Sequence, residues 1–376
     1  MLGWRGFLAG FLAGLLVAGC GASSGGEGEV GIPFANGVEC LGEEAAPSEQ
    51  EVVFVSPDGR DDNPGTETAT WQTLAHALCQ AQPGQTINIL PGVYRESVVM
   101  GLFGSADFPI TIQGVPDGDE LPILDGEGMR TMGIGLVESA NIVIANLEFR
   151  NYTDEGLYVL VGEDMVIRGN RFVGNGRASI DPEFDGEGFG VQISGGKRII
   201  IENNEASQNG PGPDRVADGI LGTGIDTYEL EDSIIRDNYS HHNTGGGMLV
   251  EDSINVLVAG NRIEANELDA NGDYWDGGIW VDGGHDITLR GNEVRDNHGP
   301  GIELSDEDVR YPDNSYGYVL ENNTIANNEF GLYIWNWGQC LPPETAVILQ
   351  QNDITNNTQQ DVWCAEWMCG EGEACE

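Results

Sequence analysis

The feature that most constrains the fold is a pair of asparagines, five residues apart, that recurs eight times between residues 146 and 357. The first members are Asn146, Asn170, Asn204, Asn238, Asn261, Asn292, Asn323 and Asn352, and the second are Asn151, Asn175, Asn209, Asn243, Asn266, Asn297, Asn328 and Asn357. Successive first members lie 23 to 34 residues apart, and the shortest intervals suit one turn of a three-sided coil. This pattern predicts a solenoid, because corner loops can lengthen without disturbing the stack. Asparagine tolerates left-handed backbone and bonds nearby amides, so both sets are expected to be structural.

A glycine opens each repeat and provides a third marker. The glycines are Gly156, Gly190, Gly219, Gly247, Gly278, Gly301 and Gly331. In the phrase Gly278-Ile-Trp-Val281 the flanking apolar residues are expected to point inward and the middle residue outward. The same reading of every repeat predicts an outward column of Tyr158, Gln192, Leu221, Leu249, Trp280, Glu303 and Tyr333. Neighbours in such a column lie about 4.8 Å apart, close to the repeat of an extended sugar chain.

The segment before the repeats carries a recognisable signature. A β-rich run over 51–55 is followed by turn residues, by apolar residues at helical spacing over 71–81, and by a strand over 86–90. The phrases that follow are Pro91-Gly-Val-Tyr-Arg-Glu96, Pro109-Ile-Thr-Ile-Gln-Gly114 and Ile123-Leu-Asp-Gly126. This block closely resembles the N-terminal signature of many pectate-lyase-like right-handed parallel β-helix proteins. The resemblance implies the fold but no single activity, since the same block opens lyases, hydrolases and proteins of no known chemistry.

We therefore predict an all-β protein, a right-handed single-stranded parallel β-helix of about ten coils. An N-terminal helix is expected to cap one end, because the open end of a stacked core would otherwise face water. The expected organisation is a signal peptide over 1–20, a flexible acidic tether over 21–50 and the β-helix domain over 51–376. Within that domain, 51–130 holds the cap and first coils, 131–357 the asparagine-marked repeats, and 358–376 a disulfide-tied C-terminal cap.

Residues 1–20 are expected to be an export signal. The apolar run over 7–18 is too short to span a membrane comfortably, and it ends in Leu16-Val-Ala-Gly-Cys20. This ending resembles the bacterial lipobox, which implies that Cys20 becomes the lipidated N-terminus. Because Gly21 follows and not aspartate, the resemblance favours the outer membrane or cell surface of a Gram-negative bacterium. The alternative is an ordinary secretory signal with a chance cysteine.

Six further cysteines follow: Cys40, Cys79, Cys340, Cys364, Cys369 and Cys375. An even number in an exported chain is typical of disulfides. Cys40 and Cys79 are expected to pair, and the pairing of the C-terminal four is left open.

The chain carries 62 acidic and 16 basic residues, a formal net charge of −46. This charge disfavours contact with nucleic acid and with anionic membranes, so the only expected membrane contact is the lipid anchor. Two explanations of the acidic composition are open. One is a solvated acidic surface, and the other is a set of specific Ca²⁺ sites, for which oxygen ligands are abundant. The sequence requires no cofactor, Ca²⁺ is the one cofactor that it suggests, and a monomer is expected.

Long insertions flank the outward column and supply the candidate site. The candidate catalytic residues are Asp185, Glu187, Asp218 and Asp276, with His242 as an acid or base near Asp218. Carboxylates one or two coils apart would be roughly 5–10 Å apart, a range that includes both separations used in glycoside hydrolysis. The alternative role is Ca²⁺ binding by Asp154, Asp185 and Asp218. The candidate substrate-binding residues are Tyr158, Trp280, Tyr333, Trp275 and Arg215.

The pectate-lyase-like resemblance implies, in some branches, a lysine or arginine that abstracts a proton beside calcium-bound uronate. The only lysine, Lys197, lies in the segment Ser194-Gly-Gly-Lys-Arg198, out of phase with the acidic loops. The chain also lacks the aspartate and Gly-His-Gly signatures of polygalacturonase-like hydrolases. We therefore predict a surface protein directed at polysaccharide, either an enzyme (hydrolase, lyase or epimerase) or a non-catalytic adhesion or structural envelope protein.

Overall fold

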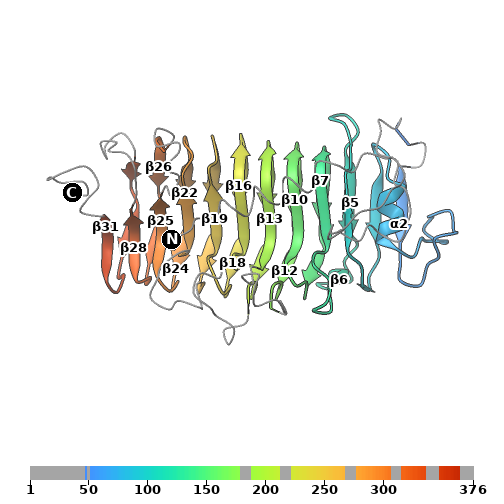
Figure 1. Cartoon of the computed structure of the whole chain (residues 1–376), viewed down its shortest axis with the longest axis horizontal. Helices are drawn as coiled ribbons and strands as arrows, with labels where there is room; N and C mark the ends of the chain where they lie inside the picture. The colour runs from blue at the N-terminus through green and yellow to red at the C-terminus, as the bar shows by residue number, and fades with distance from the viewer. Residues whose placement is uncertain are drawn as a thin grey trace, which may run out of the picture. The chain divides into compact units, whose positions relative to one another are not determined.

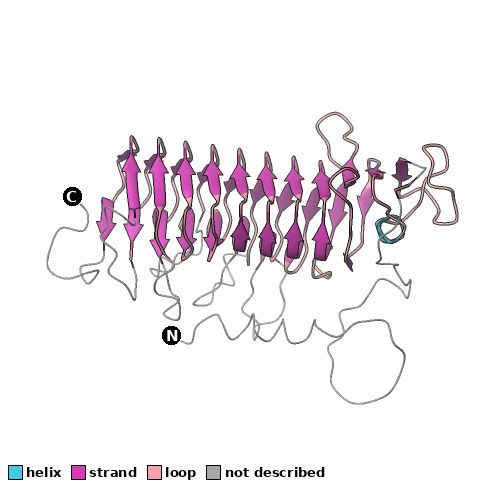
Figure 2. Ribbon diagram, turned by 90° about the horizontal axis from the view of Figure 1, so that it is seen from above, coloured by secondary structure: helices cyan, strands magenta, loops and turns pink. Residues whose placement is uncertain are grey.

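The computed structural model describes residues 47–48, 51–177, 188–211, 222–266, 277–305, 315–335 and 347–364. All of these residues belong to one compact unit, which spans 35–376. Its strands stack in parallel into three sheets of 11, 10 and 10 strands (Figures 1 and 2). Every coil of the repeat region contributes one strand to each sheet, so the parallel β-helix predicted from the repeat is confirmed.

The first sheet contains β1 (Val52–Val55), β2 (Thr86–Ile89), β5 (Ile110–Gly114), β8 (Ile142–Ala145), β11 (Val166–Arg168), β14 (Ile200–Glu202), β17 (Ile234–Arg236), β20 (Leu257–Ala259), β23 (Thr288–Arg290), β26 (Tyr318–Glu321) and β29 (Val347–Gln350). The second contains β4 (Val98–Met100), β7 (Ile134–Ala140), β10 (Glu155–Glu163), β13 (Phe189–Lys197), β16 (Ile225–Glu231), β19 (Met248–Glu251), β22 (Ile279–Asp282), β25 (Pro300–Ser305), β28 (Phe330–Ile334) and β31 (Gln360–Cys364). The third contains β3 (Val93–Tyr94), β6 (Ile123–Asp125), β9 (Glu148–Arg150), β12 (Arg171–Val173), β15 (Glu205–Ser207), β18 (Tyr239–His241), β21 (Arg262–Glu264), β24 (Glu293–Arg295), β27 (Thr324–Ala326) and β30 (Asp353–Thr355).

The expected helix is present but shorter than the sequence indicated. Helix α2 spans Leu74–Cys79 and lies at the end of the stack beside the first strands (Figure 1). Both oxygens of the Glu96 carboxylate accept hydrogen bonds from the first helical amides, those of Leu74 and Ala75, each at 2.9 Å. The helix buries Leu74, Ala77 and Leu78, which is the face that the helical spacing predicted.

The asparagines form two continuous ladders inside the corners. Asn204 Nδ2 donates to Asn238 Oδ1 in the next coil at 3.0 Å and to the carbonyl of Ile167 at 2.9 Å. Its Oδ1 in turn accepts hydrogen bonds from the backbone and side-chain nitrogens of Asn170. The same bonds repeat from coil to coil, so the structural role predicted for the asparagines is confirmed.

Two details of the repeat differ from the prediction. The ladder asparagines do not have left-handed backbone; that conformation belongs to the preceding residue in each coil, such as Asn203 at φ 54°. Asn146 and Asn151 are themselves left-handed, and Leu147 and Tyr152 occupy the ladder positions beside them, where their amides bond Asn170 and Asn175. The first pair of asparagines is therefore shifted by one residue, because the same residue type suits both adjacent positions.

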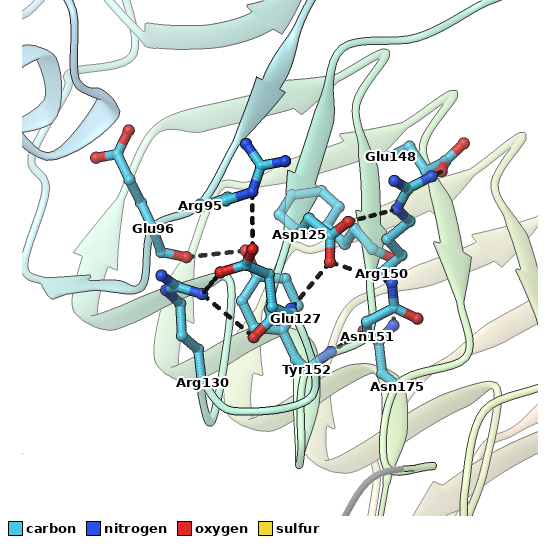
Figure 3. A network of polar contacts seen from close by, with 12 residues as sticks. Arg95, Glu96, Asp125, Glu127, Arg130, Glu148, Arg150, Asn151, Tyr152 and Asn175 are labelled. Atoms are coloured by element: carbon cyan, nitrogen blue, oxygen red, sulfur yellow. Dashed lines mark hydrogen bonds and ion pairs between the residues drawn. The ribbon is translucent and has the colours of Figure 1, made fainter. Parts of the chain in front are cut away.

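A polar network fastens the first coils of the third sheet (Figure 3). The Asp125 carboxylate accepts hydrogen bonds from the Glu127 amide, from Asn151 and from Arg150 at 2.9–3.1 Å. Burial alone would raise the pKa of Asp125, but these bonds together hold it below its ordinary value. Beside it, the buried Tyr152 donates its hydroxyl to the carbonyl of Glu96 at 2.9 Å. The network therefore joins coils that are far apart in sequence.

Several predictions about the ends of the chain fall outside the described residues. The structure does not describe Cys20, Cys40, Cys340, Cys369 or Cys375. The lipid anchor, the disulfide pairs and the disulfide-tied C-terminal cap therefore stay predictions. Within the part of the chain that is described, no helix has the length and apolarity needed to cross a membrane.

Candidate functional site

One outward column runs along the second sheet, as the repeat predicted, with one member corrected. Strand pairing aligns Tyr158, Gln192, Asp226, Leu249, Trp280, Glu303, Tyr333 and Trp363. Leu221 was expected in the third place, but that place belongs to Asp226. The coil is marked by Gly224, not Gly219, because an added Cβ on Gly224 would meet the corner side chains Ser240 and Asn243, as the other marker glycines do. Leu221 itself lies outside the described residues.

Asp226 is the most unusual group in this column. Its side chain is 3% exposed, and its Oδ1 accepts only a long hydrogen bond of 3.4 Å from Gln192. Its Oδ2 accepts no hydrogen bond from any described residue. Burial raises the pKa of Asp226 to about 7, and the weak bond from Gln192 offsets this only in part. Such a carboxyl exchanges its proton near neutral pH, which suits a general acid or base.

Two acidic residues, Glu155 and Asp154, lie near Tyr158 on β10 or just before it. Strand β10 is two strands from the strand of Asp226 in the second sheet. Burial raises the pKa of the Tyr158 phenol, and the charges of Glu155 and Asp226 raise it further, while a hydrogen bond with Ser194 lowers it. Asp154 precedes β10, and burial raises its pKa to about 6 against a hydrogen bond from the Thr153 hydroxyl. The region therefore concentrates protons that are held or released near neutrality.

A second outward column lies two residues further along the same strands. Strand pairing aligns Leu160, Ser194, Tyr228, Glu251, Asp282 and Ser305 in it. Burial is the main cause that raises the pKa of Tyr228, and the neighbouring carboxylates Glu229, Asp252 and Glu251 contribute. Because Glu251 acts on the Tyr228 phenol, its carboxylate lies on this same face.

A hydrogen-bonded chain ties the two columns together near their C-terminal end. Trp280 donates its indole N–H to the Ser305 hydroxyl, and Ser305 donates to Asp282 Oδ1 at 2.7 Å. In the first column, Glu303 accepts a hydrogen bond from the indole of Trp335. Asp282 is 5% exposed and Glu303 is fully buried. The two columns thus hold four carboxyl groups, those of Asp226, Glu251, Asp282 and Glu303, on one face.

The aromatic residues of the column are less open than the prediction required. Trp280 is 6% exposed and is held by Ser305, so in this structure it is no open platform for a sugar ring. Tyr158 and Tyr333 are partly exposed. Tyr333 stacks on Trp363 with ring centroids 4.2 Å apart and an interplanar angle of 9°. The most open aromatic pair is therefore Tyr333 and Trp363, and Trp363 was not among the predicted residues.

The candidate His242 lies apart from this site, and so does the lysine that the sequence analysis set aside. His242 is exposed at the corner after β18, in left-handed backbone, with its Nδ1 2.8 Å from Nδ1 of His241. Lys197 ends β13 and forms ion pairs with Glu231 and Asp232. Asp154 is described above, but no group of three metal-ligating side chains is present among the described residues. The remaining candidates, Asp185, Glu187, Arg215, Asp218, Trp275 and Asp276, lie outside them.

Of the two column residues that the sequence reasoning missed, Asp226 could have been found from the sequence and Trp363 could not. In four coils the marker glycine precedes the first ladder asparagine by 14 residues, as Gly278 precedes Asn292. Counting back 14 residues from Asn238 gives Gly224, and the second residue after it is Asp226. No such glycine marks the last strand, so Trp363 carries no comparable signal.

Three parallel sheets around one apolar core, with an acidic outward face on the second, define this chain as a parallel β-helix protein. Residues 53–258 match the family described as the Pel9A-like, right handed beta helix region, and residues 222–369 match the right handed beta helix region. Since the first match covers more than half of the chain, the protein belongs to the Pel9A-like right-handed β-helix family. The handedness predicted from the N-terminal signature is thereby confirmed.

Individual relatives are distant. The chain is 27% identical over 315 residues to the uncharacterized protein YwoF of Bacillus subtilis (strain 168), covering 74% of this chain and 63% of that protein. It therefore spans less than two thirds of that relative's length. Pectate lyase Pel9A superposes with a TM-score of 0.59 at 13% identity, covering 87% of this chain and 82% of the lyase. The alginate lyase from Paenibacillus sp. str. FPU-7 gives 0.55 at 15% identity, covering 77% and 95%. At these identities the two structures show a shared fold.

Proposed function

We propose that the protein hydrolyses an extended polysaccharide laid across the outward face of the second sheet. The observation that carries this proposal is Asp226, a buried carboxyl whose Oδ2 accepts no hydrogen bond from the described residues and whose pKa is about 7. A general acid works best when its pKa lies near the working pH, and burial is a common means of raising a carboxyl to that range. A carbohydrate target is supported by the polysaccharide lyases that share the fold.

Glu251 is the second carboxyl of the proposed mechanism. It lies two residues beyond Leu249, the residue that pairs with Asp226. Strand spacing puts the two α-carbons roughly 8 Å apart on one face of the sheet. This backbone spacing allows the carboxyl groups the separation of about 6.5–9.5 Å that inverting glycosidases use. Protonated Asp226 gives its proton to the glycosidic oxygen while the bond from that oxygen to C1 breaks. Glu251 takes a proton from the water that attacks C1, leaving a new reducing end and a free hydroxyl.

The neighbours of Asp226 suit a sugar chain. Gln192 and Tyr158 are partly exposed and offer hydrogen-bond donors to sugar hydroxyls. Further along the column, Tyr333 and Trp363 present stacked rings, and aromatic faces pack against the axial hydrogens of sugar rings. This pair favours a second candidate function, in which the protein binds the polysaccharide without cleaving it. The predicted role of Trp275, Arg215 and the acidic loop residues in binding the polysaccharide stays part of the proposal. Ca²⁺ binding by the acidic residues also stays part of it, in a role separate from the reaction itself.

A product assay separates these functions. We expect neutral and amino-containing polysaccharides to yield reducing ends and no unsaturated product absorbance, and we expect chelation of Ca²⁺ to leave the rate unchanged. Unsaturated products would contradict hydrolysis in favour of elimination. Binding without any product would contradict catalysis and leave the second candidate. A rate abolished by chelation would assign Ca²⁺ a part in the reaction.

We also propose that the protein is exported and anchored by a lipid on Cys20, at the outer membrane or cell surface of a Gram-negative bacterium, as a monomer. The lipobox-like ending at Cys20 supports this proposal. Replacing Cys20 by serine is expected to shift the protein from the membrane fraction to the soluble exported fraction, as measured by fractionation and by incorporation of labelled palmitate. Unchanged membrane association of Cys20→Ser would contradict the anchor.

A further inference from the structure

Two neighbouring histidines meet at the corner that follows the third sheet. His241 is the last residue of β18 and lies on the outward face of the sheet, because Ser240 before it is buried. His242 begins the corner with a φ of 55°, in the left-handed region. In a continuing strand the next side chain would point to the opposite face, but here Nδ1 of His242 lies 2.8 Å from Nδ1 of His241. The corner therefore places two imidazole nitrogens side by side at the surface.

The contacts of His241 decide which of its two nitrogens carries the hydrogen. Its Nε2 lies 3.4 Å from Oε1 of Glu205, and since an ionised carboxylate only accepts, Nε2 is the donor. In the neutral ring the other nitrogen, Nδ1, then presents a lone pair. The ring also stacks on Tyr239, with ring centroids 4.0 Å apart. A carboxylate that takes the second N–H of a histidine is the usual support of a metal-ligating imidazole, so His241 is oriented as a ligand.

His242 can supply a second nitrogen to the same ion. At 2.8 Å the two Nδ1 atoms share one hydrogen, which His242 donates to His241. Because His242 is exposed, its ring can carry that hydrogen on Nε2 and turn its Nδ1 lone pair toward an ion held by His241. Two nitrogen ligands at a right angle, each about 2.0–2.1 Å from a metal, lie about 2.9 Å apart. Right angles between ligands are typical of square-planar Cu²⁺ and Ni²⁺, so the present separation suits these ions.

We infer that His241 and His242 bind one divalent transition-metal ion through their Nδ1 atoms, with water in the remaining positions, and that Cu²⁺ binds most tightly. The surroundings favour a cation, since the chain carries a formal net charge of −46 and Glu205 lies beside the pair. The neighbouring Arg262 is paired with Glu264 at 2.7 Å. Among the residues that the structure describes, no third metal-ligating side chain joins the pair, which leaves the ion open to solvent. The site lies at the edge of the third sheet, so it does not depend on the function proposed for the second.

Titration of Cu²⁺ into the protein, followed by electron paramagnetic resonance, tests this inference. We expect one equivalent to bind with hyperfine coupling to two nitrogen ligands. His242→Asn removes one ligand and keeps the left-handed backbone, because Asn327 and Asn356 occupy the same corner position in other coils. Loss of a supporting partner alone costs about 10–100-fold in metal affinity, so His242→Asn and His241→Gln are each expected to bind Cu²⁺ at least about tenfold more weakly.

His285→Gln is the matched control. His285 lies between β22 and β23, and its Nδ1 is 2.9 Å from the Asp286 carboxylate. This variant should keep both the affinity and the coupling to two nitrogens. An acidic protein also binds Cu²⁺ through carboxylates, which give a spectrum without nitrogen coupling. Such a spectrum from the wild type, or an unchanged affinity in His242→Asn, would overturn the inference. Thermal unfolding without metal checks that each variant is folded, and an equal loss of affinity in the control would also count against the site.

Discussion

Replacing Asp226 by asparagine is expected to slow cleavage about 10²–10⁴-fold and, above pH 7, to raise the stability of the folded protein. The catalytic loss follows from removal of the proton that the leaving oxygen needs, and general acid catalysis contributes about 10²–10⁴-fold. The wild-type rate is expected to fall as the pH rises through about 7, where Asp226 loses its proton. The residual rate of Asp226→Asn should not change with pH in this range.

The effect of pH on stability through Asp226 has the opposite sign from the effect through an ordinary surface carboxyl. An unfolded aspartate titrates near 3.9, so the folded state binds the extra proton between about pH 4 and pH 7, and stability falls as the pH rises through that window. Moving the pKa from about 4 to about 7 corresponds to about 4 kcal/mol. The asparagine avoids this cost but leaves a buried amide N–H to satisfy, which returns about 1–3 kcal/mol. A net rise of a few degrees in Tm at pH 8 is expected.

Thermal unfolding of the two proteins at pH 5 and pH 8, together with the reducing-end assay, measures both effects. Asp237→Asn serves as the control, because it removes a charge at an exposed corner between the first and third sheets, where asparagine tolerates the φ of 54°. The control should leave the rate unchanged and its Tm within about one degree of the wild type. An Asp226→Asn variant that is slower but less stable at pH 8 would mean that Asp226 is an ionised structural residue.

The fold was predictable because its signals are repeated. Each coil repeats the same inward apolar residues, marker glycine and corner asparagines, so one misaligned copy does not hide the pattern. The predictions were wrong where the alignment of a coil depended on one position. Asn146 resembles a ladder residue but lies one place earlier, since asparagine also tolerates left-handed backbone. Gly219 was taken for the marker in place of Gly224, because an insertion changes the count between neighbouring coils.

The candidate site was less predictable, because burial and hydrogen bonding do not follow the repeat. The sequence places Trp280 on the outward face, but its contact with Ser305, in the next coil, decides that the indole is enclosed. It likewise cannot show that Asp226 receives only one long hydrogen bond from the described residues, whereas Asp282 accepts a hydrogen bond of 2.7 Å from Ser305. The long insertions carry most of the predicted acids, and their lengths vary from coil to coil, so the repeat supplies no register for them.

The second large expected effect concerns the asparagine ladder. Replacing Asn204 by alanine is expected to destabilise the protein by about 3–5 kcal/mol, because one side chain serves both neighbouring coils. Its loss leaves the Asn170 amide without the Oδ1 that it now bonds at 3.0 Å, and the carbonyl of Ile167 without its donor at 2.9 Å. All of these groups are buried in the middle of the stack, where water cannot replace the missing partner.

Asn352→Ala is the matched control, since Asn352 makes the same bonds to Leu320 and Asn323 but lies in the last described coil and is only partly buried. Water can reach its orphaned partners, so a cost of about 1 kcal/mol is expected. Guanidinium unfolding followed by circular dichroism measures both variants. Equal midpoints would show that the ladder adds nothing beyond ordinary corner hydrogen bonds. A large shift confined to Asn204→Ala would show that its strength depends on exclusion of water from the interior of the stack.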